Sequence, residues 1–137
     1  MKEILSKLNY RDWPRICVLN GDNKFIMKLR KVLPSKKIDP EIDPKYLYEF
    51  IIIIAYKIAD IEEYTPPAVH NLGEDGLLWV FYPKKSSDRF SSDISRDKGW
   101  DILKKNGFKA VRQVSVDDNF SALRFRNTKF VKSGDNK

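Results

Sequence analysis

The stretch that decides the fold is residues 76–87, GLLWVFYPKKSS, in which an unbroken apolar run ends at Pro83 and is followed by Lys84, Lys85, Ser86 and Ser87. Apolar residues that do not alternate with polar ones are typical of a strand buried on both faces, and proline cannot donate to a central ladder. In open α/β sheets, ligands bind beyond the carboxyl ends of the strands. This stretch therefore predicts a central parallel strand that carries two cations and two hydroxyls to a ligand site.

Two other apolar runs predict buried strands beside this one. They span residues 16–19 and 50–55, and the second is rich in isoleucine, which is typical of parallel strands. After the first run, apolar residues recur at helical spacing, with Asp22 as the expected cap and Pro34 as the stop. The chain therefore begins with a strand, a tight turn and an amphipathic helix.

The middle of the chain predicts a loop, a strand and a second helix. Residues 35–49 are rich in proline and acidic side chains, so they predict a loop with at most a short edge strand around Ile38. A helix is expected after residue 55, and Pro66 and Pro67 should kink or restart it, with Thr65 as a candidate cap.

The last third predicts a short helix and a hairpin. The helix should close at Gly107, and two runs with period two, residues 108–116 and 120–126, then surround a short polar turn. Arg124 and Arg126 alternate with apolar residues in the second run, which favours a charged face turned outward to solvent.

This order of elements predicts the fold class α/β. We expect a compact Rossmann-like, mostly parallel sheet with helices on both faces and a C-terminal antiparallel hairpin. The chain has 137 residues, which suits a single domain over residues 1–126 followed by a flexible polar tail over residues 127–137.

Charge and composition restrict the partners. The net charge is +7, and it divides into +7 over residues 1–38, −7 over residues 39–82 and +7 over residues 83–137. A uniform nucleic-acid surface would not have such an acidic middle, so direct nucleic-acid binding is disfavoured.

No apolar stretch approaches the roughly 20 residues of a membrane helix, and one cysteine allows no internal disulfide, so a cytoplasmic protein is expected. The sequence leaves the oligomeric state open.

The strand-end cations predict an anion site. Lys84 and Lys85, with the hydroxyls of Ser86 and Ser87, can hold a phosphate or carboxylate through charge-assisted hydrogen bonds. Asn20 and Gly21 follow the first strand, so the N–H groups of the next helix should face the same site. Asp22 competes for that positive helix end. The alternative is a solvated loop in which a serine caps a helix.

Four further charged residues are expected to support this site. Arg96 and Asp97 are predicted to pair with Asp93 or Asp117 and so to order the loop after the central strand.

Catalytic constellations are sparse. His70 is the only histidine, which disfavours a zinc site or a histidine-based triad, and no metal site is expected. Cys17 lies inside an apolar strand, where burial makes a thiol inert. The sequence therefore favours a binding protein over an enzyme.

The predicted layout resembles that of class I methyltransferases, whose sheets end in a similar hairpin. The resemblance implies S-adenosylmethionine as a cofactor, with Asp39 or Asp43 as the acid that would hold its ribose. Those enzymes normally carry a glycine-rich turn after the first strand, whereas this turn holds Gly21 alone. The Asp/Asn-Pro-Pro signature of many amino- and base-methylating members is absent after Ala55.

Several spaced motifs resemble a small bacterial family known as a domain of unknown function. The resemblance covers residues 8–126 and implies a Rossmann-like fold and a bacterial cytoplasmic protein, but no reaction. The motifs that carry it are Trp79, Tyr82, Pro83, Lys84, Lys85, Ser86 and Ser87; Asp93, Arg96 and Asp97; Val111, Arg112 and Gln113; and Asp117, Ser121, Leu123, Arg124, Phe125 and Arg126.

Three hypotheses follow from the sequence. The first is a non-catalytic module that binds an anionic, phosphate-bearing or nucleotide-like small ligand at the carboxyl edge of the sheet. It needs no cofactor. The second is a degenerate S-adenosylmethionine-dependent methyltransferase, and the third is a protein-interaction module that uses its charged faces.

Overall fold

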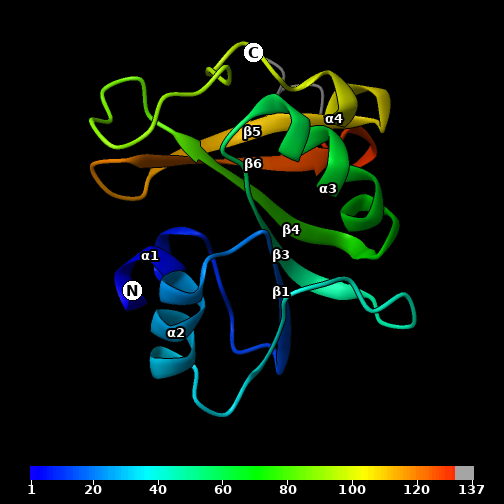
Figure 1. Ribbon diagram of the computed structural model, residues 1–137. Helices are drawn as coiled ribbons and strands as arrows, with labels where there is room; N and C mark the ends of the chain where they lie inside the picture. The colour runs from blue at the N-terminus through cyan, green and yellow to red at the C-terminus, as the bar shows by residue number, and fades with distance from the viewer. Residues whose placement is uncertain (132–137) are drawn as a thin grey trace.

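The computed structural model describes residues 1–131 and contains one sheet of six strands in the order β2-β1-β3-β4-β6-β5 (Figure 1). The first four strands in this order are parallel, and β6 runs antiparallel to both β4 and β5. This arrangement confirms the expected α/β fold with a C-terminal antiparallel hairpin. The strands are β1 (Arg15–Leu19), β2 (Lys37–Asp39), β3 (Tyr48–Ile54), β4 (Leu72–Pro83), β5 (Phe108–Ser115) and β6 (Phe120–Asn127).

The strand order reverses at β1. From β1 the chain moves outward to β2 and then returns to the other side of β1 to form β3, β4 and the hairpin. The carboxyl ends of β1 and β3 therefore flank a topological switch point, where the connecting loops diverge and leave a crevice.

Helices cover both faces of the sheet, as the sequence predicts (Figure 1). Successive residues of β3 show this division: Ile51 and Ile53 belong to the core beneath α3 and α4, whereas Ile52 belongs to the core beneath α1 and α2. The helices are α1 (Lys2–Lys7), α2 (Asn23–Val32), α3 (Ile58–His70) and α4 (Asp101–Lys105), followed by a 3-10 turn, η1 (Thr128–Phe130). In the described part of the chain, no helix is long and apolar enough to cross a membrane.

Strand β4 is the buried central strand that the opening stretch predicts. Leu78, Trp79 and Val80 are all fully buried, and Pro83 is the last paired residue, opposite Phe120. The indole Nε1 of Trp79 donates to the carbonyl oxygen of Leu8 at 2.9 Å. This bond fixes the end of α1 on the sheet.

The prediction of a kinked or restarted helix at Pro66 and Pro67 is wrong. Helix α3 is one continuous α-helix that contains both prolines, and Thr65 lies buried within it. Both prolines are exposed, so the carbonyl groups that they leave without intrahelical donors can bind water. The N-terminal end of α3 is capped instead by Asp60, whose carboxylate accepts hydrogen bonds from the N–H groups of Tyr56 and Lys57.

The C-terminal region contains the predicted hairpin. Asp117 forms the turn, because its carboxylate accepts hydrogen bonds from the N–H groups of Asn119 and Phe120. Of the predicted tail, residue 127 ends β6 and residues 128–130 form η1. Residues 132–137 lie outside the described part.

Candidate functional site

Asn20 occupies the turn after β1 and gives the switch point its shape. Its φ of 63° lies in the left-handed region, which asparagine tolerates better than most residues. Its side-chain amide donates to the carbonyl oxygen of Ile54 at 2.8 Å, which ties the end of β1 to the end of β3. Asn20 therefore takes a conformation for which a glycine-rich turn would use glycine.

Gly21 is needed for close packing. A Cβ atom at this position would lie 3.1 Å from Val18 Cγ1 and 3.3 Å from Ile26 Cδ1. The next residue, Asp22, caps α2, because its carboxylate accepts a hydrogen bond of 2.8 Å from the N–H of Phe25. The positive end of α2 thus already faces a carboxylate, as the sequence indicated.

A cavity of about 490 Å³ lies beyond the carboxyl ends of β1 and β2, against α3 and beside the switch point; we call it the switch-point cavity. Glu41 and Glu63 supply charge to its wall, and none of the described residues that line it is lysine or arginine. Such a lining favours a ligand that carries positive charge or hydroxyl donors over an anion. The lining residues are Val18, Leu19, Asn20, Gly21, Pro40, Glu41, Ile42, Glu63, Tyr64 and Pro67.

The two acids proposed to hold a ribose have structural partners instead. Arg15 Nε lies 2.6 Å from Asp39 Oδ2, and Arg15 Nη2 lies 2.9 Å from Asp43 Oδ2. The Tyr48 hydroxyl also donates to Asp39. Neither carboxylate lines the switch-point cavity, whereas Glu41, which lies between them in the sequence, does.

Hydrogen bonding keeps Asp43 in its charged form. The N–H of Lys45 and the guanidinium of Arg15 lower the pKa of the Asp43 carboxyl below its usual value. Burial and the hydrogen bond to Asp39 raise the pKa of the Tyr48 phenol. The cluster is therefore a structural clamp between the start of β1, the end of β2 and the loop before β3.

Lys84 and Lys85 line a second, smaller cavity of about 280 Å³ at the end of β4; we call it the β4-end cavity. Arg96 and Asp97 belong to the same cavity, so it brings three cations together with one carboxylate. Its remaining wall is formed by Tyr82, Pro83, Ser95, Gln113 and Ser121.

The other residues of the predicted anion site lie elsewhere. Asn20 and Gly21 line the switch-point cavity. Ser86 is exposed, and the Ser87 hydroxyl donates to Asn119 Oδ1 at 2.8 Å. Neither serine lines the β4-end cavity. The structure thus divides the predicted set between two cavities, and anion binding at Lys84 and Lys85 stays a prediction.

Two of the supporting residues, Asp93 and Arg96, accept hydrogen bonds that hold neighbouring segments in place. Asp93 accepts a hydrogen bond of 2.8 Å from the N–H of Ile58 at the start of α3. The carbonyl of Arg96 accepts one from the Trp100 indole. Within residues 1–131, neither Arg96 nor Asp97 forms an ion pair with Asp93 or Asp117, so the expected pairing is absent there.

A third cavity, of about 480 Å³, was not predicted from the sequence; we call it the aromatic cleft. It lies beyond the carboxyl ends of β3 and β4, at Ile54 and Phe81, on the face that carries α1 and α2. Aromatic rings and cations line it together: Phe25, Tyr56, Phe81, Phe90 and Phe120, with Lys24, Lys28, Lys31 and Arg89.

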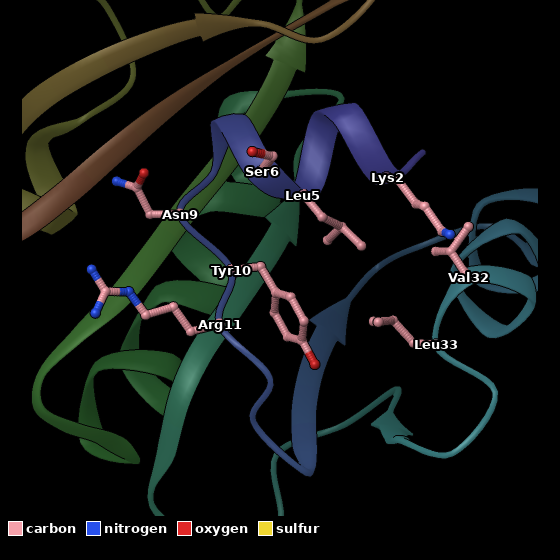
Figure 2. A pocket seen from close by; sticks show the side chains of 8 residues that line it. All are labelled: Lys2, Leu5, Ser6, Asn9, Tyr10, Arg11, Val32 and Leu33. Carbon is pink, nitrogen blue, oxygen red and sulfur yellow. The ribbon is translucent and has the colours of Figure 1, made fainter.

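Figure 2 shows another cavity, which lies between α1 and the end of α2. The Tyr10 ring and Leu33 lie on one side of the segment after α1, whereas Asn9 and Arg11 extend to the other side. Tyr10 donates to the carbonyl oxygen of Trp13 at 2.9 Å and packs edge-on against Phe50. This arrangement stabilises the fold, and the cavity does not include residues from the carboxyl ends of the strands.

Arg124 is not part of an outward, solvated face. Its side chain is only 17% exposed, and its Nε has no hydrogen-bond partner among the described residues. Arg112 lies directly opposite on β5, and the nearest carboxylate oxygen of Asp75 is 4.0 Å away. Burial lowers the pKa of the Arg124 guanidinium, and the positive charge of Arg126 adds to this effect.

Comparison with known proteins identifies the fold of this chain but assigns the chain to no family. No family model matches the chain, and no curated protein matches it. Solved structures do match. One is an S-adenosylmethionine-dependent methyltransferase from Aquifex aeolicus, with a TM-score of 0.59 and 10% identity over 92% of this chain and 88% of the other.

Two further matches are methyltransferases. The glycopeptide N-methyltransferase MtfA aligns with a TM-score of 0.58 and 8% identity over 90% of this chain and 92% of the other. The ribosomal protein L11 methylase from Lactobacillus delbrueckii subsp. bulgaricus aligns with a TM-score of 0.56 and 10% identity over 89% and 74%. At such identities the likeness concerns the fold alone, and the chain has the Rossmann-like α/β fold of the methyltransferases.

Proposed function

We propose that this protein binds S-adenosylmethionine in the switch-point cavity and is methyltransferase-like. The observation that carries the proposal is the acidic lining of that cavity. Glu41 and Glu63 line it, and none of its described lining residues is lysine or arginine. The cavity lies beside β1, where the strand order reverses. The fold is shared with proteins whose names include S-adenosylmethionine-dependent methyltransferase, and MtfA is also known in complex with sinefungin.

The lining residues fit the chemistry of this cofactor. S-adenosylmethionine carries a positive sulfonium and a positive ammonium group, two ribose hydroxyls that donate hydrogen bonds, and a flat base. Glu41, beyond the end of β2, would accept hydrogen bonds from the hydroxyls, and Glu63 would balance positive charge. Ile42 and Tyr64 provide an apolar and an aromatic wall for the base.

The surrounding residues hold the cavity in place before a ligand arrives. Asn20 fixes the ends of β1 and β3 against each other, and Arg15 fixes Asp39 and Asp43 on either side of Glu41. When bound, the cofactor supplies an electrophilic methyl group. The protein's part is to bind and orient it with groups that need little rearrangement.

Calorimetric titration with S-adenosylmethionine tests this proposal. We expect saturable binding, and Glu41→Gln should weaken it by about tenfold, because a hydrogen bond to a charged acceptor contributes roughly 1.5 to 3 kcal/mol. Glu62→Gln is the matched control, because Glu62 is exposed on α3 but does not line the cavity. Absence of heat at millimolar cofactor, or equal losses in both variants, would contradict the proposal.

A second candidate function is anion binding in the β4-end cavity, supported by the gathering of Lys84, Lys85 and Arg96 there. Lys84 Nζ already donates to Ser115 Oγ at 2.7 Å, so the ammonium group is held in position. Inorganic phosphate should raise the thermal unfolding midpoint, and the double variant Lys84→Ala/Lys85→Ala should lose this effect.

The control for that experiment is Lys104→Ala/Lys105→Ala, which removes an exposed adjacent pair at the end of α4. Equal stabilisation by phosphate in wild type and in both double variants would remove Lys84 and Lys85 from the site.

A further inference from the structure

We propose that the aromatic cleft binds a nucleotide, with the base against its rings and the phosphates along the lysines of α2. This site is separate from the switch-point cavity, and the proposal does not depend on the cofactor proposed there. The ligand chemistry is a planar base joined to one or more phosphates. A free nucleotide and the end of a nucleic-acid strand both provide it.

The rings of the cleft are packed against one another but not covered. Tyr56, Phe90 and Phe120 form a cluster with ring centroids 5.3 to 5.8 Å apart, and Phe25 packs edge-on against Phe81 at 5.7 Å. All of these except Phe81 are only partly buried, and all line the same cavity. Aromatic faces that meet at an open cavity are suited to stacking with a flat ligand.

The cations occupy one side of the cleft. Lys24, Lys28 and Lys31 are spaced four and three residues apart on α2, so they share one helix face and span about 10 Å along it. Arg89 joins them from the loop after β4, with its guanidinium 5.2 Å from the centre of the Phe90 ring. Among residues 1–131, none of these four cations forms an ion pair.

The two acids of the cleft, Asp22 and Asp117, form no ion pair with these cations in the described part of the chain. Asp22 accepts a hydrogen bond from the N–H of Phe25, and Asp117 accepts two from its own turn. Backbone donors orient both carboxylates, and because the four cationic side chains outnumber these two acids, the lining keeps an excess of positive charge for an anionic ligand. A row of lysines about 10 Å long is longer than a single phosphate group, so it suits a polyphosphate or the backbone of a nucleic-acid strand.

Position supports the same ligand. The cleft opens at the carboxyl ends of β3 and β4, where ligands of open α/β sheets bind. Neither half of the lining alone would select a nucleotide, because an apolar groove accepts many ligands and a lysine row accepts any polyanion. Rings and lysines in one cavity of about 480 Å³ match a molecule that has both a flat apolar part and a charged part.

Titration with four probes tests the proposal: ATP, adenosine, inorganic triphosphate and a single-stranded uridine pentanucleotide. ATP should bind at least tenfold more tightly than adenosine or triphosphate, because only ATP engages both halves of the cleft. Lys28→Ala/Lys31→Ala should weaken ATP binding by at least tenfold, whereas Arg30→Ala, at an exposed position of the same helix that does not line the cleft, should leave it within twofold.

Two further variants keep the result interpretable. Phe120→Leu should weaken ATP and adenosine binding but not triphosphate binding. Glu41→Gln should leave ATP binding unchanged, which separates this site from the switch-point cavity. A pentanucleotide that binds more tightly than ATP identifies a strand as the source, and one that binds no more tightly identifies a free nucleotide. Three results would overturn the proposal. They are no binding of ATP or of the pentanucleotide at 1 mM, triphosphate binding as tight as ATP binding, and ATP binding that Lys28→Ala/Lys31→Ala does not change.

Discussion

The side chain of Asn20 and the main chain of Ile54 form a 2.8 Å hydrogen bond that joins the carboxyl ends of β1 and β3. Both the switch-point cavity and the aromatic cleft border this junction, because Asn20 lines the first and Ile54 lines the second. The bond therefore holds the edge that both proposed sites share. Asn20 makes it from a left-handed backbone conformation.

Substitution of Asn20 should separate its two roles. Asn20→Ala loses the hydrogen bond and adds left-handed strain, so we expect a loss of about 2 kcal/mol in the free energy of unfolding. Asn20→Gly loses the bond but removes the strain, so the loss should be about 1 kcal/mol. Urea unfolding of both variants measures the difference. Equal stability of wild type and Asn20→Ala would show that neither the bond nor the strain matters.

The strands could be predicted because burial on both faces leaves a direct trace in sequence. The apolar run that contains Trp79 and the isoleucine run that contains Ile52 need no partner information to be identified as buried parallel strands. The continuity of α3 could not be predicted, because whether Pro66 and Pro67 are tolerated depends on which side of the helix faces water.

Thr65 gives a second prediction, which concerns α3. Its side chain is fully buried, and its hydroxyl oxygen has no hydrogen-bond partner among the described residues. Thr65→Val replaces the hydroxyl with a methyl group of similar size, so the free energy of unfolding should rise by about 1 kcal/mol.

Thr65→Ser is the matched control for this variant. It keeps the unpaired hydroxyl and removes a methyl group, so it should lower stability by about 1 kcal/mol. Thermal and urea unfolding of both variants measure these changes. A less stable Thr65→Val would mean that the hydroxyl is satisfied by a group such as a bound water.

The clamp around Arg15 predicts a pH dependence. Because hydrogen bonds lower the folded pKa of Asp43, that carboxyl stabilises the protein above its unfolded pKa, and the stabilisation is lost as the pH falls through the folded pKa. Stability should therefore fall as the pH drops from about 5 towards 2. Arg15→Met should lower stability at pH 7, because it leaves buried Asp39 without its cation, and should make the acid dependence shallower.

Unfolding at a series of pH values measures both effects. Lys36→Met is the control, because it removes the ion pair with the solvent-exposed Asp12 and should leave the slope between pH 5 and 2 unchanged. An unchanged slope in Arg15→Met would show that Arg15 does not set the protonation of Asp43.

The candidate sites were only partly predictable. The rule that ligands bind at strand ends identifies Lys84 and Asn20 individually, but their assignment to different cavities depends on how the strands are ordered across the sheet. Glu41 follows the end of β2 and is found by the same rule. The aromatic cleft has no such signal, because Phe25, Phe90 and Phe120 come from distant parts of the chain and each resembles an ordinary core residue.

Arg124 carries the last prediction. Its partly buried guanidinium faces Arg112 across the strands, its neighbour Arg126 takes the close contacts with Asp75, and its own Nε is unpaired among residues 1–131. Like charges directly opposite in a sheet are destabilising, and a desolvated charge without a close partner costs free energy. Arg124→Met keeps most of the side-chain volume, so it should raise the free energy of unfolding by about 1 kcal/mol.

Arg112→Met is the control for this variant. It removes the repulsion but leaves the buried charge, so its gain in the free energy of unfolding should be smaller, and urea unfolding compares the two variants. A less stable Arg124→Met would show that the guanidinium has a partner in solution, and phosphate-dependent stability lost in that variant would identify the partner as an anion.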